Sequence, residues 1–191
     1  MRYINMAAMA GAMVWLGGCA SASRVDVAGA VGPAPSEARA GTGDGSLVVW
    51  SARTPADVDV NLAEWRWNND FGRNEFLYEP AHSDYTIYKP TGEVVEHVRN
   101  SHDVDDPAPT RVMLPAGTYK VEAEALDCQS ERIQALMTVV IEPGQTTAAY
   151  LDGDWKPQGG PEGTELARLP CGRPVGWLAP EAAYSTAQAS R

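Results

Sequence analysis

The side chains most suited to catalysis stand next to one another at His82, Ser83 and Asp84, which are the residue types of a hydrolase triad. Neighbouring side chains on an extended segment point to alternating faces, so these three cannot form the hydrogen-bonded relay that such a triad needs. The sequence also lacks the Gly-x-Ser-x-Gly turn that positions many nucleophilic serines. A turn leading into a strand explains the triplet better. We therefore expect no catalytic residue and no enzymatic activity.

A loop rich in carboxylates offers a second kind of chemistry, the binding of a cation. Asp103, Asp105 and Asp106 lie within one polar stretch, and calcium takes several oxygen ligands from flexible loops. The spacing of an EF-hand is missing, and acidic loops in an acidic protein are usually only solvated. His97 and His102 would suit zinc only if the loop folded back. We expect no metal and no other cofactor, with the three aspartates as weak calcium candidates.

Aromatic side chains concentrate in residues 53–83, a stretch without a regular pattern of strand or helix. Trp65 and Trp67 are two positions apart, so they share one face of an extended segment. Paired indoles with polar rims suit stacking on sugar rings or on a partner's surface, and Phe71 and Tyr78 belong to the same candidate binding site. The alternative is that the two tryptophans are buried as a local core. Loops of this length are uncommon in compact domains and are often functional.

The amino-terminal residues have the order of parts of a secretory signal. A positive residue, Arg2, precedes an apolar stretch too short to span a membrane, and Leu16-Gly17-Gly18-Cys19 follows. LGGC resembles the bacterial lipobox. That resemblance implies cleavage before Cys19, lipidation of its thiol and new amino group, and, because Ala20 follows, sorting to the outer membrane. The alternative is an ordinary signal peptide cleaved nearby, with Cys19 incidental.

The two other cysteines, Cys128 and Cys171, suggest one disulfide, as is common in exported proteins. By chain entropy a bond closing a loop of about 44 residues stabilises the fold by at most roughly 4 kcal/mol. Two unpaired thiols are the alternative, because a cysteine near the end of the chain can lie too far from its partner.

Composition indicates a globular protein of ordinary size. Of 191 residues, 44% are hydrophobic and 21% are charged, and the formal net charge is -10. Cleavage of residues 1–18 removes one charged side chain, Arg2, and takes the net charge from -10 to -11. This balance gives no electrostatic reason to expect nucleic acid or an anionic membrane surface as a partner.

The elements that must position these residues are strands. Residues 110–125 alternate apolar and polar side chains on either side of Pro115-Ala116-Gly117, which predicts two antiparallel strands joined by a turn. Residues 46–52 are apolar on both faces, as in a strand inside a sandwich. Turn signals predict two more strand pairs, residues 84–89 with 93–99 and residues 134–142 with 145–152. About seven short strands favour a two-sheet sandwich.

The flanking segments lack this periodicity. Residues 1–18 are predicted to be a lipoprotein signal peptide, and residues 19–45, rich in Ala, Gly, Ser and Pro, a flexible tether. The sandwich covers residues 46–152. Residues 153–191 are predicted to be a Gly- and Pro-rich tail that lies extended on the sandwich, held by Cys171 and Trp177 and mobile at its end.

The central part of the chain resembles a family of sandwich domains. YTIYKPTGEVVEHVRN, TRVMLPAGTYKVEAEA and VVIEPGQTTAAYLDGDW look like the carboxypeptidase regulatory-like and PEGA-type domains, also described as prealbumin-like, in bacterial lipoproteins. The resemblance covers residues 47–151 and implies an accessory, structural or binding role without shared catalytic residues. The aromatic insertion at 53–83 and the DCQSER stretch at Cys128 depart from the family pattern.

We therefore predict an all-β protein, with a single seven-stranded Ig-like or prealbumin-like sandwich. Its expected role is a lipid-anchored, non-catalytic structural or protein-interaction module, at the outer membrane facing the periplasm or at the cell surface. The alternative is a carbohydrate- or peptidoglycan-binding module that uses the aromatic loop. The expected partners are the membrane, through Cys19, and an envelope protein or a glycan, but not nucleic acid.

Overall fold

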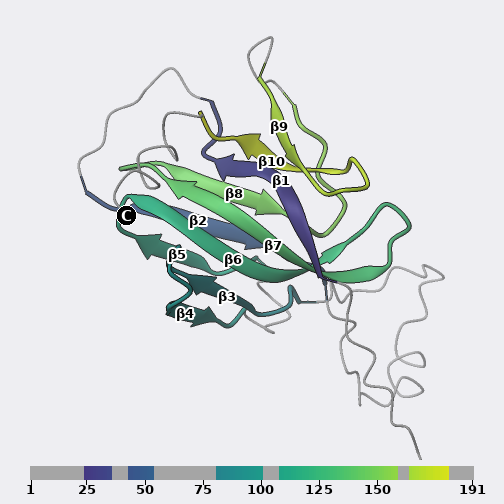
Figure 1. Ribbon diagram of the computed structural model, residues 1–191, viewed down its shortest axis with the longest axis horizontal. Coiled ribbons are helices and arrows are strands. Elements are labelled where there is room, and N and C mark those ends of the chain that lie inside the picture. Colours follow the sequence, from purple (N-terminus) through teal and green to yellow (C-terminus); the bar gives the residue numbers. More distant parts are fainter. Residues whose placement is uncertain (1–23, 36–42, 54–80, 101–107, 159–163, 181–191) are drawn as a thin grey trace, which may run out of the picture.

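The computed structural model describes residues 24–35, 43–53, 81–100, 108–158 and 164–180. These residues form ten strands in two sheets and contain no helix, which confirms the all-β sandwich (Figure 1). The large sheet has seven strands in the order β10-β9-β1-β7-β6-β3-β4, and the small sheet has three in the order β5-β2-β8. No helix long and apolar enough to cross a membrane occurs in the described part of the chain.

The strands are β1 (Arg24–Gly32), β2 (Gly45–Trp50), β3 (Tyr85–Tyr88), β4 (Val94–Val98), β5 (Arg111–Leu114), β6 (Gly117–Leu126), β7 (Arg132–Ile141), β8 (Thr146–Tyr150), β9 (Leu166–Arg168) and β10 (Pro174–Leu178). The seven strands predicted within residues 46–152 are therefore present as β2 to β8. The count of seven for the whole sandwich is too low, because β1, β9 and β10 come from the predicted tether and tail.

The core lies between the two sheets and follows the alternation in the sequence. On β6, Val121, Ala123 and Ala125 are buried, and Glu122 and Glu124, which alternate with them, point to the other face of the sheet. Met137 and Val139 on β7 face the same core, as do Leu47 and Val49 on β2.

Two of the three predicted strand pairs are not hairpins, because in each of them the two strands belong to different sheets. The β3–β4 pair is a hairpin, as predicted. In contrast, β5 pairs with β2 in the small sheet, whereas β6 pairs with β3 and β7 in the large sheet, so Pro115-Ala116 carries the chain from one sheet to the other. Pro143-Gly144 does the same between β7 and β8. Both strands at such a corner bury one face in a common core, and alternation alone does not separate this arrangement from a hairpin.

The prediction of a flexible tether is wrong for Arg24–Gly32, which form β1 inside the large sheet. This strand runs parallel to β7, with Arg24 opposite Gln134, and it pairs with β9 and β10 on its other side. The alternation of buried and exposed side chains along β1 is interrupted by a register shift between Asp26 and Ala30, so the sequence shows no regular period there. Gly29, with a positive φ of 83°, allows this irregularity.

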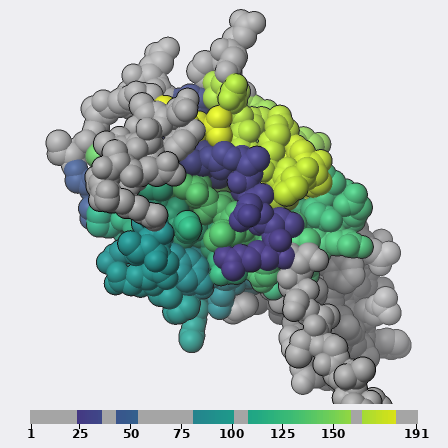
Figure 2. Space-filling view, viewed as in Figure 1, coloured from purple at the N-terminus to yellow at the C-terminus, as the bar shows by residue number. Residues whose placement is uncertain are grey.

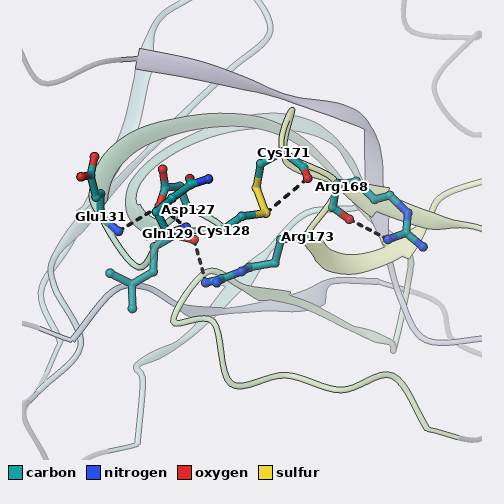
Figure 3. Close-up of a disulfide and its surroundings, with 9 residues drawn as sticks. Asp127, Cys128, Gln129, Glu131, Arg168, Cys171 and Arg173 are labelled. Carbon is teal, nitrogen blue, oxygen red and sulfur yellow. Dashed lines mark hydrogen bonds between the residues drawn. A yellow bond between two sulfur atoms is a disulfide. The ribbon is translucent and has the colours of Figure 1, made fainter.

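The tail is likewise part of the sheet, because β9 and β10 form a hairpin at its edge. The prediction that Cys171 attaches the tail to the sandwich is confirmed. Cys128 and Cys171 form a disulfide with their Cα atoms 6.0 Å apart, joining the β6–β7 turn to the β9–β10 turn (Figure 3). Arg173 adds a hydrogen bond of 3.0 Å from Nη1 to the carbonyl of Leu126.

One lateral edge of the sandwich is closed. There β1 and β10 approach β8, with an isolated bridge between Pro33 and Thr147. A Cβ atom at Gly176 would lie 2.6 Å from Cγ1 of Val31 and 3.1 Å from the carbonyl oxygen of Ala148, so glycine allows this close approach without a shift of the neighbouring atoms. The opposite edges end in β4 and β5. Figure 2 shows β1 (purple), a strand of the large sheet, on the visible surface between the β9–β10 hairpin (yellow) and the β3–β4 hairpin (teal).

Candidate functional site

Most of the side chains predicted to bind a ligand fall outside the described residues. This holds for the lipidation residue, the four aromatic residues of the insertion and the three calcium candidates, namely Cys19, Trp65, Trp67, Phe71, Tyr78, Asp103, Asp105 and Asp106. Within the described part of the chain, no group of three or more His, Cys, Asp or Glu side chains converges as a metal site.

The structure brings together a different set of aromatic side chains, which we call the aromatic row: Trp50, Tyr150, Trp155 and Trp177. The rings of Trp50 and Tyr150 are stacked at a centroid distance of 6.2 Å, and Tyr150 and Trp155 at 4.5 Å. Trp177 meets Trp155 edge to face at 5.8 Å. The four side chains are half-buried and come from β2, β8, the segment after β8, and β10. The row therefore connects the small sheet to the closed edge of the sandwich.

Pairing of distant strands creates this row. Trp50 and Tyr150 are directly opposite in the parallel register of β2 and β8, and both point outward because Val49 and Ala149 point into the core. These two residues are a hundred positions apart, so no local pattern predicts the contact. The only sequence signal available was the aromatic residue at the end of each strand.

The rings of the row bind mainly one another. The ring of Tyr150 stacks with the rings of both Trp50 and Trp155. A platform for a sugar ring needs a free aromatic face, whereas stacked and edge-to-face pairs contribute about 0.5–1.5 kcal/mol each to packing. The geometry thus favours a structural role, in which the row fixes Trp155 and β10 against the small sheet.

A buried polar cluster adjoins the row at Ser51, His82 and Ser83. His82 is only 1% exposed, and its ring edge meets Trp50 at 5.3 Å. Its Nδ1 lies 2.6 Å from the carbonyl oxygen of Ser51, and Arg53 pairs with His82 in an isolated bridge. The hydroxyl of Ser51 donates a hydrogen bond of 2.5 Å to the carbonyl of Ser83. The hydroxyl of Ser83 itself has no hydrogen-bond partner.

His82 and Asp84, two of the three residue types of a hydrolase triad, each contact a different part of the chain. His82 is held by Ser51, whereas Asp84 accepts a hydrogen bond of 2.9 Å from the amide of Asn100. The Asn100 side chain in turn donates to the carbonyl of Ser83 at 2.8 Å. The triplet therefore closes the start of β3 against the end of β4, which is the structural role expected of a turn.

Asp152 is the titratable group with the most unusual surroundings in this region. It is 8% exposed, and burial raises the pKa of its carboxyl above the ordinary value. The amide of Asp154 and the charges of His82 and Arg53 act in the opposite direction, while the charge of Asp154 adds to the increase in pKa. The cluster thus contains an acid and a histidine, but each is already used in local contacts.

A polar groove lies on the outer face of the large sheet. It is an open depression of about 370 Å³ lined by Asp84, Tyr85, Thr86, His97, Val98, Arg99, Glu122 and Gln134. Thr86 Oγ1 and His97 Nδ1 are 3.0 Å apart on its floor, and Tyr88 donates a hydrogen bond of 3.0 Å to Glu122. Its charges are of both signs, and Arg24 nearby lies 3.6 Å from Glu122. The groove is therefore polar without selecting an anion or a cation.

Comparison of this chain with protein-family models, with curated proteins and with solved structures finds no match.

Proposed function

We propose that this protein is a lipid-anchored envelope protein that presents a non-catalytic β-sandwich as a structural or protein-interaction module. It is exported and attached through Cys19, at the outer membrane facing the periplasm or at the cell surface. The resemblance to carboxypeptidase regulatory-like and PEGA-type domains belongs to this proposal, and so does an Ig-like or prealbumin-like topology. Their support is the pattern of strands β2 to β8 in two packed sheets.

The observation that carries the proposal is the distribution of the three cysteines. Cys128 and Cys171 are exposed and pair with each other at the surface. An exposed disulfide persists in an oxidising compartment and would be reduced in the cytosol, which supports export. Cys19 is the remaining thiol, and it directly follows the apolar leader that resembles a lipobox.

The proposal is tested by partition of the full protein into detergent and by the mass of its mature amino terminus. We expect the wild-type chain to begin at a diacylated Cys19 and to enter the detergent phase. Cys19→Ala should keep its leader and lose the lipid. The matched control is Cys128→Ala/Cys171→Ala, which removes the other two cysteines and should remain lipidated. An unmodified mature terminus at a residue other than Cys19 contradicts the proposal.

A second candidate function is binding of carbohydrate or peptidoglycan through Trp65, Trp67 and their neighbours. The favouring observation is that Arg53 and His82, which flank this segment, pair beside the aromatic row. The test is retention of the protein on purified peptidoglycan. Trp65→Ala/Trp67→Ala should lose retention, whereas Trp155→Ala, which alters the row, should keep it. Equal retention of the wild type and the double variant removes this function.

A further inference from the structure

The first strand begins very close to the proposed lipid attachment site. Only residues 20–23 separate Cys19 from Arg24, the first residue of β1. An extended chain advances at most roughly 3.6 Å per residue, so the Cα atoms of these two residues lie within roughly 18 Å of each other. In a lipidated protein Cys19 is at the bilayer surface, because its acyl chains are inserted there.

Arg24 is also firmly placed in the fold. It is in register with Gln134 of β7, and Val25 follows opposite Ala135, so the strand is paired from its first residue. The chain from the lipid therefore enters the middle of the large sheet and not a loose end of the domain. A flexible spacer that could hold the sandwich away from the bilayer does not fit between the two points.

One end of the sandwich, which we call the Arg24 end, is defined by the start of β1 and the turns at residues 127–131 and 169–173. Leu126 and Arg132 are paired next to the first turn, and the disulfide joins the two turns (Figure 3). The far end carries the turns at residues 89–93, 115–116 and 143–144, beside the pairing of Gly117 with Ile141. The two ends are separated by β6, ten residues or about 33 Å long (Figure 1).

The charges at the Arg24 end do not explain membrane contact by themselves. Arg24 and Arg132 are exposed there, but they pair with Glu122 at 3.6 Å and Glu124 at 2.7 Å. Exposed Glu131 and exposed Arg168 add one charge of each sign to the same surface. A mixed surface of this kind neither attracts nor repels anionic headgroups strongly. Contact must then come from the short covalent connection and should resist salt.

We infer that the Arg24 end rests against the lipid headgroups and that the far end points away from the membrane. The inference rests on the proposed lipidation of Cys19. It leaves the turns of the far end, and not those joined by the disulfide, exposed beyond the headgroup layer.

The test uses the lipidated full-length protein in vesicles of phosphatidylethanolamine and phosphatidylglycerol. A fluorescent amino acid replaces either Gln129 at the Arg24 end or Thr91 at the far end, both of which are exposed. Vesicles contain a quencher attached to the lipid headgroups. We expect quenching to be several-fold stronger at position 129 than at position 91, and the difference to persist in about 1 M salt, where exposed charges are screened.

The matched control inserts a Gly/Ser linker of about 20 residues after Ser23, which lets the domain move tens of ångströms from its anchor. This insertion should bring quenching at position 129 down to the value at position 91. Equal quenching in the lipidated protein without the linker, or stronger quenching at position 91, overturns the inference alone. A mature protein without lipid, identified by mass before reconstitution, overturns the proposed function and the inference with it.

Discussion

Among the described residues, Asp152 is the only buried carboxylic acid, and its surroundings make a pH-dependent prediction at the level of one side chain. Burial raises its pKa in the folded protein above the value in the unfolded chain. The proton is thus bound more tightly in the folded state. The contribution of Asp152 to stability is fully present below the unfolded pKa and is lost as the pH rises through the folded pKa.

Asp152→Asn tests this, because asparagine keeps an oxygen that can accept the hydrogen bond from the amide of Asp154. We expect the variant to have a higher free energy of unfolding than the wild type at about pH 7, and the difference to vanish at about pH 3. Urea denaturation at both values measures it. Asp26→Asn, at an exposed position on β1, is the control without a burial effect. Destabilisation of Asp152→Asn at neutral pH would mean that the attraction of His82 and Arg53 outweighs burial.

The disulfide acts between elements, since it fastens the β9–β10 hairpin to the turn between β6 and β7. Cys128→Ser/Cys171→Ser should lower the free energy of unfolding by roughly 2–4 kcal/mol, as expected for a loop of this length. Hydrogen exchange should rise first in β9 and β10, because they lie at the edge of the large sheet, while β6 and β7 stay protected. Equal exchange in β10 of both proteins would show that the aromatic row and Arg173 hold the hairpin without the bond.

The elements also show where sequence reasoning succeeds and where it stops. Strands β2 to β8 follow from alternation and turn residues, because both are local properties of the chain. Their partners do not follow, and for this reason the local pattern predicts hairpins at Pro115 and Pro143, where the chain in fact passes from one sheet to the other. Strand β1 was missed because an irregularity near Gly29 and small residues hide its period. The aromatic row depends on the parallel pairing of Trp50 and Tyr150, which has no local signal.

At the scale of the whole molecule, the added strands change the boundaries of the folding unit. β1, β9 and β10 form one side of the large sheet and close the edge of the sandwich beside β8. They contribute Val31 and Val175, both fully buried, to the common core. Removing them would also uncover Val139 of β7, which lies opposite Val31. Residues 24–180 are therefore a more complete unit than residues 46–152.

Two soluble fragments decide between these boundaries. We expect residues 24–180 to unfold in a single cooperative transition and residues 46–152 to lose fixed tertiary packing. Each buried aliphatic side chain that becomes exposed or is removed costs roughly 1.5–3 kcal/mol, and the total stability of a domain is only about 5–15 kcal/mol. Near-ultraviolet circular dichroism and urea titration provide the comparison. A third fragment, residues 46–180, separates the contribution of β1 from that of the β9–β10 hairpin. If residues 46–152 unfold as cooperatively as residues 24–180 and at a similar urea concentration, β1 is not required for the fold. The chain that leads to the lipid could then detach from the large sheet while the rest of the sandwich stays folded.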